Sequence, residues 1–230
     1  RDKYVKYVKR CIAGPGDTLV IQNKQVYLNG LLTELPENYV FSQPEIPKTM
    51  KQKAIYLSSE LNINKDNMGP IIIPKKGDYF KIDKNTNWRE LLPIMMMEGN
   101  KAELRGNEKT FIFTLQDPFE LDRRKNHPSV FEPYFGYGNG NLITPWSRQI
   151  LDNHFQYLVI NGKPIADWEG YEVKQNYYWA MGDNRDDSLD SRYWGLIPEN
   201  FILGEALFAY FSLDLRSWIP RFDRIGTIID

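Results

Sequence analysis

The side chains with most chemical capacity are concentrated in one short stretch, residues 182–195. This stretch contains four carboxylates, two arginines and two serines: Asp183, Asp186, Asp187, Asp190, Arg185, Arg192, Ser188 and Ser191. So polar a stretch is either a solvated loop or a network of charge pairs that holds something in place. Strand-like apolar sequence on both sides, at residues 177–181 and 196–206, indicates a loop that is clamped at each end.

The run of carboxylates could suggest a calcium loop, but its spacing is unsuitable. A loop that starts at Asp186 has Ser191 at the sixth position and Ile197 at the twelfth, where glycine and a bidentate glutamate belong. Arg185 and Arg192 within the acidic run instead indicate bidentate pairing inside the loop. Taken alone, the segment is equally compatible with a surface salt-bridge cluster.

The sequence has few residues that could form a disulfide, a zinc site or a histidine-based catalytic triad. The chain has one cysteine, Cys11, and two histidines, His127 and His154, so an internal disulfide is excluded and a zinc site or a histidine triad is disfavoured. We expect Cys11, whose neighbours Val8 and Ile12 are strand-forming, to be a buried small hydrophobe rather than a nucleophile. We predict no metal and no organic cofactor.

The bulk composition narrows the function classes further. With 230 residues, a net charge of −1 and no basic stripe, the chain is suited to a globular core and not to nucleic-acid binding. No segment reaches the ~18–20 apolar residues that a membrane span needs. The sequence starts without a methionine or a signal-peptide pattern, so we expect a piece of a longer protein.

The elements that must position the polar stretch are mostly strands. Residues 4–12 predict a strand, and residues 15–17 turn the chain into a second strand at 18–21. A third strand at 25–28 ends at Asn29-Gly30, which gives a β-meander. Residues 157–165 contain a similar hairpin around Asn161-Gly162, and shared turn chemistry explains this better than a repeat does.

The middle of the chain has a different character. Residues 36–53 and 117–146 are loop-like and indicate an insertion. Between them, Asn87 and Glu90 predict a helix start, Pro93 should kink or shorten that helix, and Met95–Met97 should fill the core. We therefore predict a mainly β fold with a mixed α/β insertion: residues 1–34 and 155–230 form the core, and residues 35–154 form the insertion.

Two long motifs resemble a known family. Tyr7-Val-Lys-Arg-Cys-Ile-Ala-Gly-Pro-Gly-Asp17 and, far downstream, Gly182-Asp-Asn-Arg-Asp-Asp-Ser-Leu-Asp-Ser-Arg-Tyr-Trp-Gly195 are similar to segments of the bacterial type I signal peptidases. These are membrane-anchored serine endopeptidases that use a Ser–Lys dyad. The second motif departs from the family at Asp187, where Asn is usual, and the first departs at Ala13 and Gly14. The similarity covers residues 4–34 and 155–226, and it implies a signal-peptidase-like β-rich catalytic core.

The resemblance implies that Lys9 is the general base. A lysine that accepts the serine proton must be neutral, whereas free lysine has a pKa near ~10.4, and burial lowers it by penalising the ammonium form. By the same resemblance, Ser188 orients the Lys9 amine. The supporting pairs that the family implies are Arg10 with Asp183 and Asp190 with Arg192.

Three further residues have expected roles. A carboxylate beside Lys9 would stabilise its charged form, so we predict that Asp187 points to solvent. Tyr7 and Val8 should lie on the strand that pairs with an extended substrate, with Val8 helping to form a small apolar pocket. The family implies a substrate with small residues before the cleaved bond and two positions earlier.

The family's nucleophile lies in a Ser-Met-x-Pro-Thr segment upstream of the lysine, and this chain has no Ser-Met pair. We therefore expect the nucleophile to precede Arg1 and the chain alone to be inactive. The implied partners are signal peptides of exported preproteins and the membrane surface, which an N-terminal anchor would reach, with the catalytic domain outside the cytoplasmic membrane. One alternative is a catalytically inactive relative that binds peptides or membrane partners. Another is a carbohydrate-binding β-module, suggested by the aromatic, glycine-rich residues 131–146.

Overall fold

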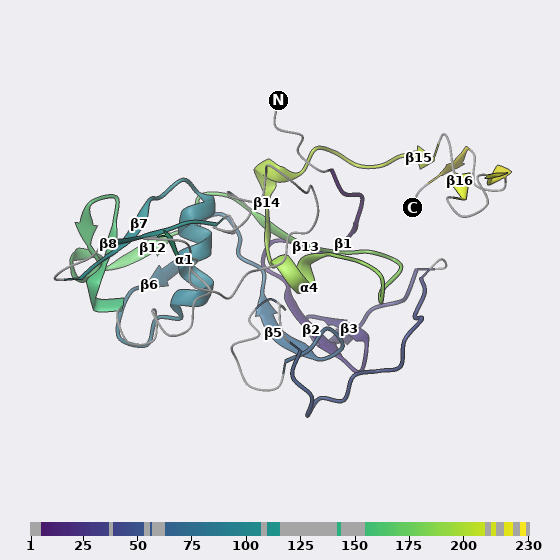
Figure 1. Cartoon of the computed structure of the whole chain (residues 1–230), viewed down its shortest axis with the longest axis horizontal. Helices are drawn as coiled ribbons and strands as arrows, with labels where there is room; N and C mark the ends of the chain where they lie inside the picture. Colours follow the sequence, from purple (N-terminus) through teal and green to yellow (C-terminus); the bar gives the residue numbers. More distant parts are fainter. Residues whose placement is uncertain are drawn as a thin grey trace. The chain divides into compact units, whose positions relative to one another are not determined.

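The computed structural model describes residues 6–36, 39–52, 56, 63–106, 110–115, 142–143, 155–209, 213–214, 219–222 and 226–228 (Figure 1). Strands dominate these residues, which confirms the mainly β prediction. The chain divides into two compact units, Lys9–Glu199 and residues 1–8 with 200–230. Both sequence motifs contribute to the first unit.

The motifs meet through a three-stranded antiparallel sheet in the order β1-β13-β14. It consists of β1 (Arg10–Ala13), β13 (Tyr177–Met181) and β14 (Ile197–Pro198). Arg10 pairs with Met181, so the residue before β1 and the loop after β13 come together at one end of the sheet. Residues far apart in sequence thus become neighbours, as the two motifs require.

The first strand differs from its prediction in two ways. It starts at Arg10, and residues 6–9 are not in a strand. The prediction of a strand over residues 4–12 is therefore wrong for residues 6–9. Cys11 is exposed, so its predicted burial is wrong. The register of β1 on β13 shifts between Cys11 and Ala13, which breaks the simple inside–outside alternation on which that prediction relied.

The predicted meander is confirmed only for its second and third strands, which pair as β2 (Thr18–Gln22) and β3 (Gln25–Leu28). The first strand, β1, pairs with β13 in a different sheet, so its predicted place in the meander is wrong. A four-stranded sheet has the order β4-β3-β2-β5, with β4 (Leu31–Leu32) and β5 (Met68–Ile72). Alternate residues of β2, Leu19 and Ile21, are buried, as expected for a sheet with one face on the core. β5 comes from the predicted insertion and pairs with β2.

Both Asn-Gly hairpin turns form as the sequence indicates. Asn29 and Gly30 have φ of 53° and 83°, and Asn161 and Gly162 have φ of 52° and 82°. Two consecutive left-handed residues are the mark of a type I′ turn, which joins twisted antiparallel strands. The second turn joins β10 (Leu158–Ile160) to β11 (Lys163–Pro164).

The remaining strands of this unit form a five-stranded sheet and a strand pair. The sheet order is β11-β10-β7-β8-β9, with β7 (Ala102–Arg105), β8 (Thr110–Phe113) and β9 (Leu142–Ile143). The pair consists of β6 (Tyr79–Lys81) and β12 (Gly170–Glu172).

The predicted helix is α1 (Trp88–Met97), with Asn87 at its N-cap position. Leu91, Leu92, Ile94 and Met95 are buried, and Met96 and Met97 pack against the core, so the methionines are core residues as predicted. The helix continues to Met97, so Pro93 does not end it. Glu98 at its end accepts hydrogen bonds from the hydroxyls of Tyr171 and Tyr177, which fastens α1 to β12 and β13.

The other helices among the described residues are single turns. They are α4 (Ser191–Trp194), η1 (Phe155–Tyr157), η2 (Ile165–Asp167) and η3 (Glu199–Phe201). In the smaller unit, β15 (Phe208–Ala209) pairs with β18 (Thr227–Ile228), and β16 (Leu213–Asp214) pairs with β17 (Ile219–Pro220). Across the described ranges, no helix has the length and apolar character to cross a membrane.

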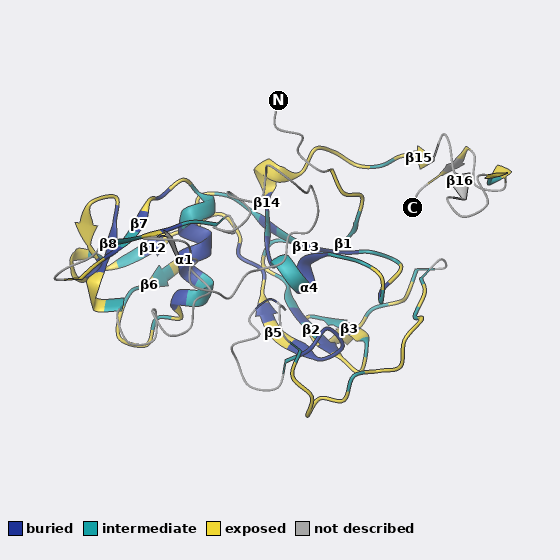
Figure 2. Cartoon of the chain, in the orientation of Figure 1, coloured by how far each residue is buried: buried dark blue, intermediate teal, exposed yellow. Residues whose placement is uncertain are grey.

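The core of the larger unit runs beneath α1, β13 and the β2–β5 pair (Figure 2). Several charged side chains are buried beside it, although charged residues are rarely buried without partners. They are Lys65, Asp66, Arg185, Asp190 and Arg192. This concentration of buried charge is located around the loop that follows β13.

Candidate functional site

The Lys9 amine and the Ser188 hydroxyl form the centre of the site. Lys9 Nζ donates a hydrogen bond of 2.8 Å to Ser188 Oγ across 179 residues of sequence. Lys9 immediately precedes β1, and Ser188 lies in the loop after β13. The antiparallel pairing of the two strands therefore creates this contact.

The surroundings of Lys9 favour the neutral amine. Burial lowers the pKa of Lys9; the negative charge of Asp190 acts in the opposite direction, and the positive charge of Arg192 lowers the pKa further. The balance is a lowered pKa, with desolvation as the largest contribution. An amine that loses its proton more readily can act as a base nearer to neutral pH.

Gly182 leaves the space in which the two side chains meet. A Cβ at this position would lie 2.2 Å from Ser188 Oγ and 3.4 Å from Lys9 Nζ. The first distance is far inside van der Waals contact, so any larger residue would displace Ser188. The motif's first glycine is thus required by close approach.

The two predicted ion pairs form around this centre. Arg10 donates from Nε to Asp183 Oδ1 at 2.9 Å and from Nη2 to Asp183 Oδ2 at 3.0 Å. These hydrogen bonds hold the pKa of Asp183 below its usual range, against the opposing effect of burial. The pair is partly exposed, so it contributes little to stability. Its main effect is to hold Arg10 and Asp183 in a fixed relative position.

The second pair is fully enclosed. Arg192 donates from Nε and Nη2 to Asp190 at 2.9 and 2.8 Å, and Asp190 also accepts the backbone N–H of Gly182 at 3.1 Å. Asp190 caps α4 as well, by accepting the N–H of Arg192. One carboxylate therefore joins the end of β13 to the start of α4 and closes the loop that carries Ser188.

Asp187, Tyr7 and Val8 are all exposed. Asp187 is exposed, as its solvent-facing prediction requires, and its charge makes only a minor contribution to raising the pKa of Lys9. Tyr7 and Val8 are 48% and 75% exposed. Substrate binding by these two residues stays a prediction.

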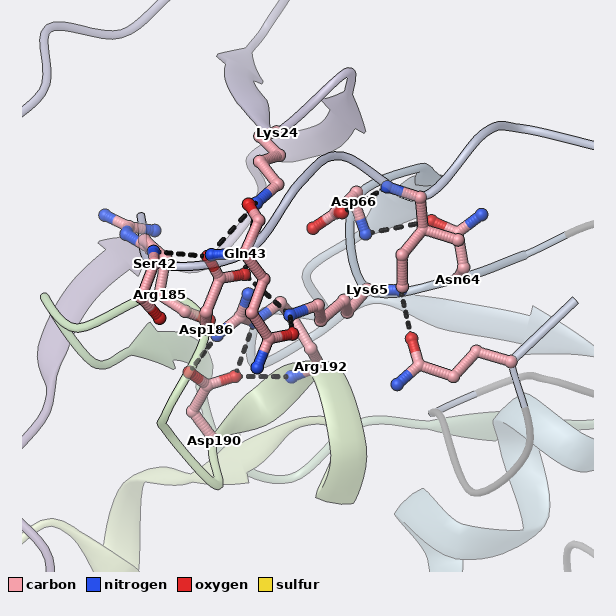
Figure 3. A network of polar contacts seen from close by, with 12 residues as sticks. Lys24, Ser42, Gln43, Asn64, Lys65, Asp66, Arg185, Asp186, Asp190 and Arg192 are labelled. Atoms are coloured by element: carbon pink, nitrogen blue, oxygen red, sulfur yellow. Dashed lines mark hydrogen bonds and ion pairs between the residues drawn. The ribbon is translucent and has the colours of Figure 1, made fainter. Parts of the chain in front are cut away.

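Sequence reasoning missed the network around Asp186. Figure 3 shows its carboxylate between Lys24, Lys65 and the backbone of Ser42 and Gln43. Burial alone would raise the pKa of Asp186, but the hydrogen bonds from these groups hold it far below its usual range. The loop-like sequence of residues 36–53 gave no sign of this contact.

Tyr56 is a second residue that the sequence did not reveal. It is buried, its N–H donates to the carbonyl of Arg192 at 2.9 Å, and its ring packs edge-on against Trp179 at 5.7 Å. A Cβ on Gly195 would lie 2.3 Å from this ring. The last glycine of the motif is therefore required by Tyr56.

The weaker alternatives receive no geometric support from the described residues. Asp186, a possible calcium ligand, is paired with two lysines, and the described residues contain no group of three or more His, Cys, Asp or Glu that could hold a metal ion. His127, His154 and most of residues 131–146 lie outside the described residues.

Comparisons with known proteins agree with the two motifs. Residues 1–87 and 122–211 match the family described as signal peptidase, peptidase S26. Signal peptidase I of Haemophilus influenzae is 30% identical over 177 residues, which is 72% of this chain and 47% of that protein. Signal peptidase I of Pseudomonas fluorescens is 37% identical over 173 residues, 67% of this chain and 56% of that protein. The Pseudomonas aeruginosa protein is 36% identical over 176 residues, 69% and 57%. The chain spans about half the length of these curated relatives.

Proposed function

Since the chain belongs to the signal peptidase family, peptidase S26, we propose that it contributes the lysine half of a Ser–Lys endopeptidase that removes signal peptides from exported preproteins. The observation that carries this proposal is the 2.8 Å contact between a partly desolvated Lys9 amine and Ser188 Oγ. None of the serines in the 230 residues is followed by Met, so the nucleophilic serine comes from outside them.

Lys9 moves the proton in this reaction. The neutral amine takes the proton of the nucleophilic serine while the serine oxygen bonds to the scissile carbonyl carbon. The resulting ammonium then gives that proton to the leaving amine as the C–N bond breaks. In the second half, Lys9 deprotonates the water that hydrolyses the ester and returns the proton to the serine.

The other site residues keep Lys9 in a productive arrangement. Ser188 aims the amine, and the pairs Arg10–Asp183 and Asp190–Arg192 fix the loop that carries Ser188. Tyr7 and Val8, next to Lys9 in the chain, offer an exposed apolar surface to an extended peptide. On this proposal, the substrates are signal peptides of preproteins at the outer face of the cytoplasmic membrane.

The direct test is cleavage of a preprotein by the full-length protein carrying Lys9→Met. We expect loss of activity by a factor of about 10³ or more, since removal of the base leaves only binding and oxyanion stabilisation. Lys9→Arg should be equally inactive because a guanidinium stays charged. Lys6→Met is the matched control, since Lys6 is exposed; it should keep near wild-type activity.

The alternative is a binding protein without catalysis. In that case the wild-type protein would bind a preprotein and leave it intact, and Lys9→Met would bind equally well. Cleavage by wild type, lost in Lys9→Met and kept in Lys6→Met, contradicts it.

A further inference from the structure

The Asp186 carboxylate is enclosed more completely than any other acid in the loop that bears Ser188, apart from Asp190. Its side chain is 0% exposed. Oδ1 accepts a hydrogen bond of 2.6 Å from Lys65, and Oδ2 accepts the N–H groups of Ser42 and Gln43, each at 2.8 Å. Lys24 donates to both oxygens at 3.2 and 3.1 Å. Five hydrogen bonds from three separate segments therefore end on one side chain.

Lys24 has a left-handed backbone conformation, which indicates that its side chain has a structural role. Asn23 and Lys24 form the turn between β2 and β3 with φ of 52° and 66°. The two Asn-Gly turns within the described ranges have glycine at the second position, Gly30 and Gly162, because left-handed backbone is unfavourable for a residue with a Cβ. At Lys24 the chain carries a strained lysine where glycine would be easier, and this lysine reaches Asp186.

Lys65 is held in an equally defined place. Its side chain is 3% exposed, and Nζ also donates to Gln43 Oε1 at 3.0 Å. The turn around it, residues 64–67, binds the β2–β3 turn, since Asn23 N donates to Asn67 Oδ1 and Lys24 N donates to Asp66 O. Lys24 and Lys65 therefore lie in two turns that are hydrogen-bonded to each other.

Residues 39–43, here called the strap, run along the same loop. Val40 N donates to Asp183 O at 2.9 Å, and Arg185 N donates to Val40 O at 3.0 Å. The strap then continues to Asp186 through Ser42 and Gln43. Lys24 covers it as well, with Nζ 4.5 Å from the centroid of the Phe41 ring.

These contacts hold the loop two residues before Ser188. On the far side, Asp190 fixes the loop two residues after Ser188 by binding Gly182 and Arg192. In the sequence, Ser188 lies midway between Asp186 and Asp190. Both carboxylates accept hydrogen bonds from cationic side chains and from backbone N–H groups, and Figure 3 shows Asp186 with its lysines and Asp190 with Arg192.

We propose that Asp186, clamped by Lys24, Lys65 and the strap, is a positioning residue that keeps Ser188 in hydrogen-bond contact with the Lys9 amine. The inference deepens the proposed function and rests on it. It assigns work in that reaction to residues 24, 39–43 and 65, which lie outside both family motifs.

The sharpest variant is Lys24→Gly in the full-length protein. Glycine suits the left-handed turn, so the fold should be retained while the ion pair to Asp186 is lost. With the clamp weakened, Ser188 should release the Lys9 amine to water for part of the time. We expect kcat to fall several-fold at neutral pH with KM little changed, and the acidic limb of the pH–rate profile to move to higher pH.

Asp186→Asn should produce the larger effect in the same direction. A raised pKa of Lys9 lowers the neutral fraction of the amine at pH values below that pKa. NMR titration of ε-¹³C-labelled lysine measures that pKa without depending on cleavage. Asp186→Glu should restore only part of the contact, because its longer side chain does not fit the same five donors.

Asp78→Asn is the matched control. Asp78 accepts the N–H of Lys75 at 2.9 Å in a turn outside both motifs. This variant should lose stability without moving the titration of Lys9. Thermal unfolding of all variants separates folding from positioning.

Two results would overturn the inference. One is a folded Lys24→Gly and a folded Asp186→Asn whose Lys9 titration and pH–rate profile match wild type. The other, if Asp186→Asn does not fold, is a wild-type profile in Lys24→Gly alone. Failure of the proposed function would look different: Lys9→Met would keep its cleavage activity, while the NMR titration would still report on the Asp186 clamp.

Discussion

The proposed role of Lys9 as a base depends on the loss of water around its amine. Charging an amine that is partly buried is unfavourable, and that penalty outweighs the attraction of nearby carboxylates. Ser188 then supplies a directed contact, the 2.8 Å hydrogen bond from the amine to Ser188 Oγ. The same residues that shield Lys9 therefore decide both its protonation and its direction.

Asp187 offers a test of the electrostatic balance, because the family usually has Asn there. Its negative charge raises the pKa of Lys9, so Asp187→Asn should lower that pKa and move the acidic limb of the kcat/KM profile to lower pH. The shift should be a fraction of a unit, since Asp187 is exposed and screened. Glu172→Gln, another exposed acid, is the control and should leave the limb in place. A shift to higher pH in Asp187→Asn would contradict this account.

Gly182→Ala tests the close approach of Ser188 and Lys9. The new Cβ would occupy the position of Ser188 Oγ, so the loop must move and the hydrogen bond to Lys9 must break. We expect kcat/KM to fall by about one to two orders of magnitude, comparable with the loss of a well-placed proton-transfer partner. Gly14→Ala is the control, because a Cβ there meets only Asp17 Oδ2 at an ordinary 3.8 Å. Equal activity in the two variants would contradict the steric argument.

At the scale of elements, sequence patterns predicted the helices, strands and turns that depend on residues close together in the sequence. The β2–β3 hairpin, both Asn-Gly turns and α1 follow from alternation, left-handed turn residues and helical spacing. The family motifs also placed Lys9 beside Ser188, and each arginine beside its aspartate.

The errors and omissions arise from long-range packing. The register shift after Cys11 left that residue exposed, and no local pattern signals such a shift. The sequence of the strap predicts only a loop, because its hydrogen bonds are made to residues 183–186, more than 140 positions away in sequence. Only Lys24, a lysine at a turn position suited to glycine, could have drawn attention to the Asp186 network.

The contact between Tyr56 and α4 gives a prediction at this scale. Gly195, the C-cap of α4, has φ of 86° and lies under the Tyr56 ring. Gly195→Ala should destabilise the protein by more than the ~1–2 kcal/mol that left-handed backbone alone costs. Tyr56→Ala should remove the ring atoms that the new Cβ would meet, so the double variant should lose less than the sum of the two single variants. Strict additivity in chemical denaturation would show that the two residues do not interact.

For the whole molecule, the acids with lowered pKa values contribute to the dependence of stability on low pH. Asp183 and Asp186 have lowered pKa values in the folded state, so each contributes stability that is present above the unfolded-state value of ~3.9 and is lost as pH falls below it. Asp186→Asn should be destabilised at pH 7 by about 3 kcal/mol, as expected for a broken buried ion pair, and should lose less further stability on acidification than wild type. Urea unfolding at pH 7 and pH 3 measures both quantities. An equal acid-induced loss in wild type and variant would contradict this assignment.

The central claim is that the loop bearing Ser188 holds the partly desolvated Lys9 amine in place. Titration of the Lys9 amine tests this claim most directly. In protein labelled with ε-¹³C lysine, the Lys9 signal, assigned by its absence in Lys9→Met, should titrate below the ~10.4 of free lysine. Ser188→Ala should change that titration, because Ser188 is the hydrogen-bond partner of the amine. A Lys9 signal that titrates together with the exposed lysines, unchanged in Ser188→Ala, would contradict the account.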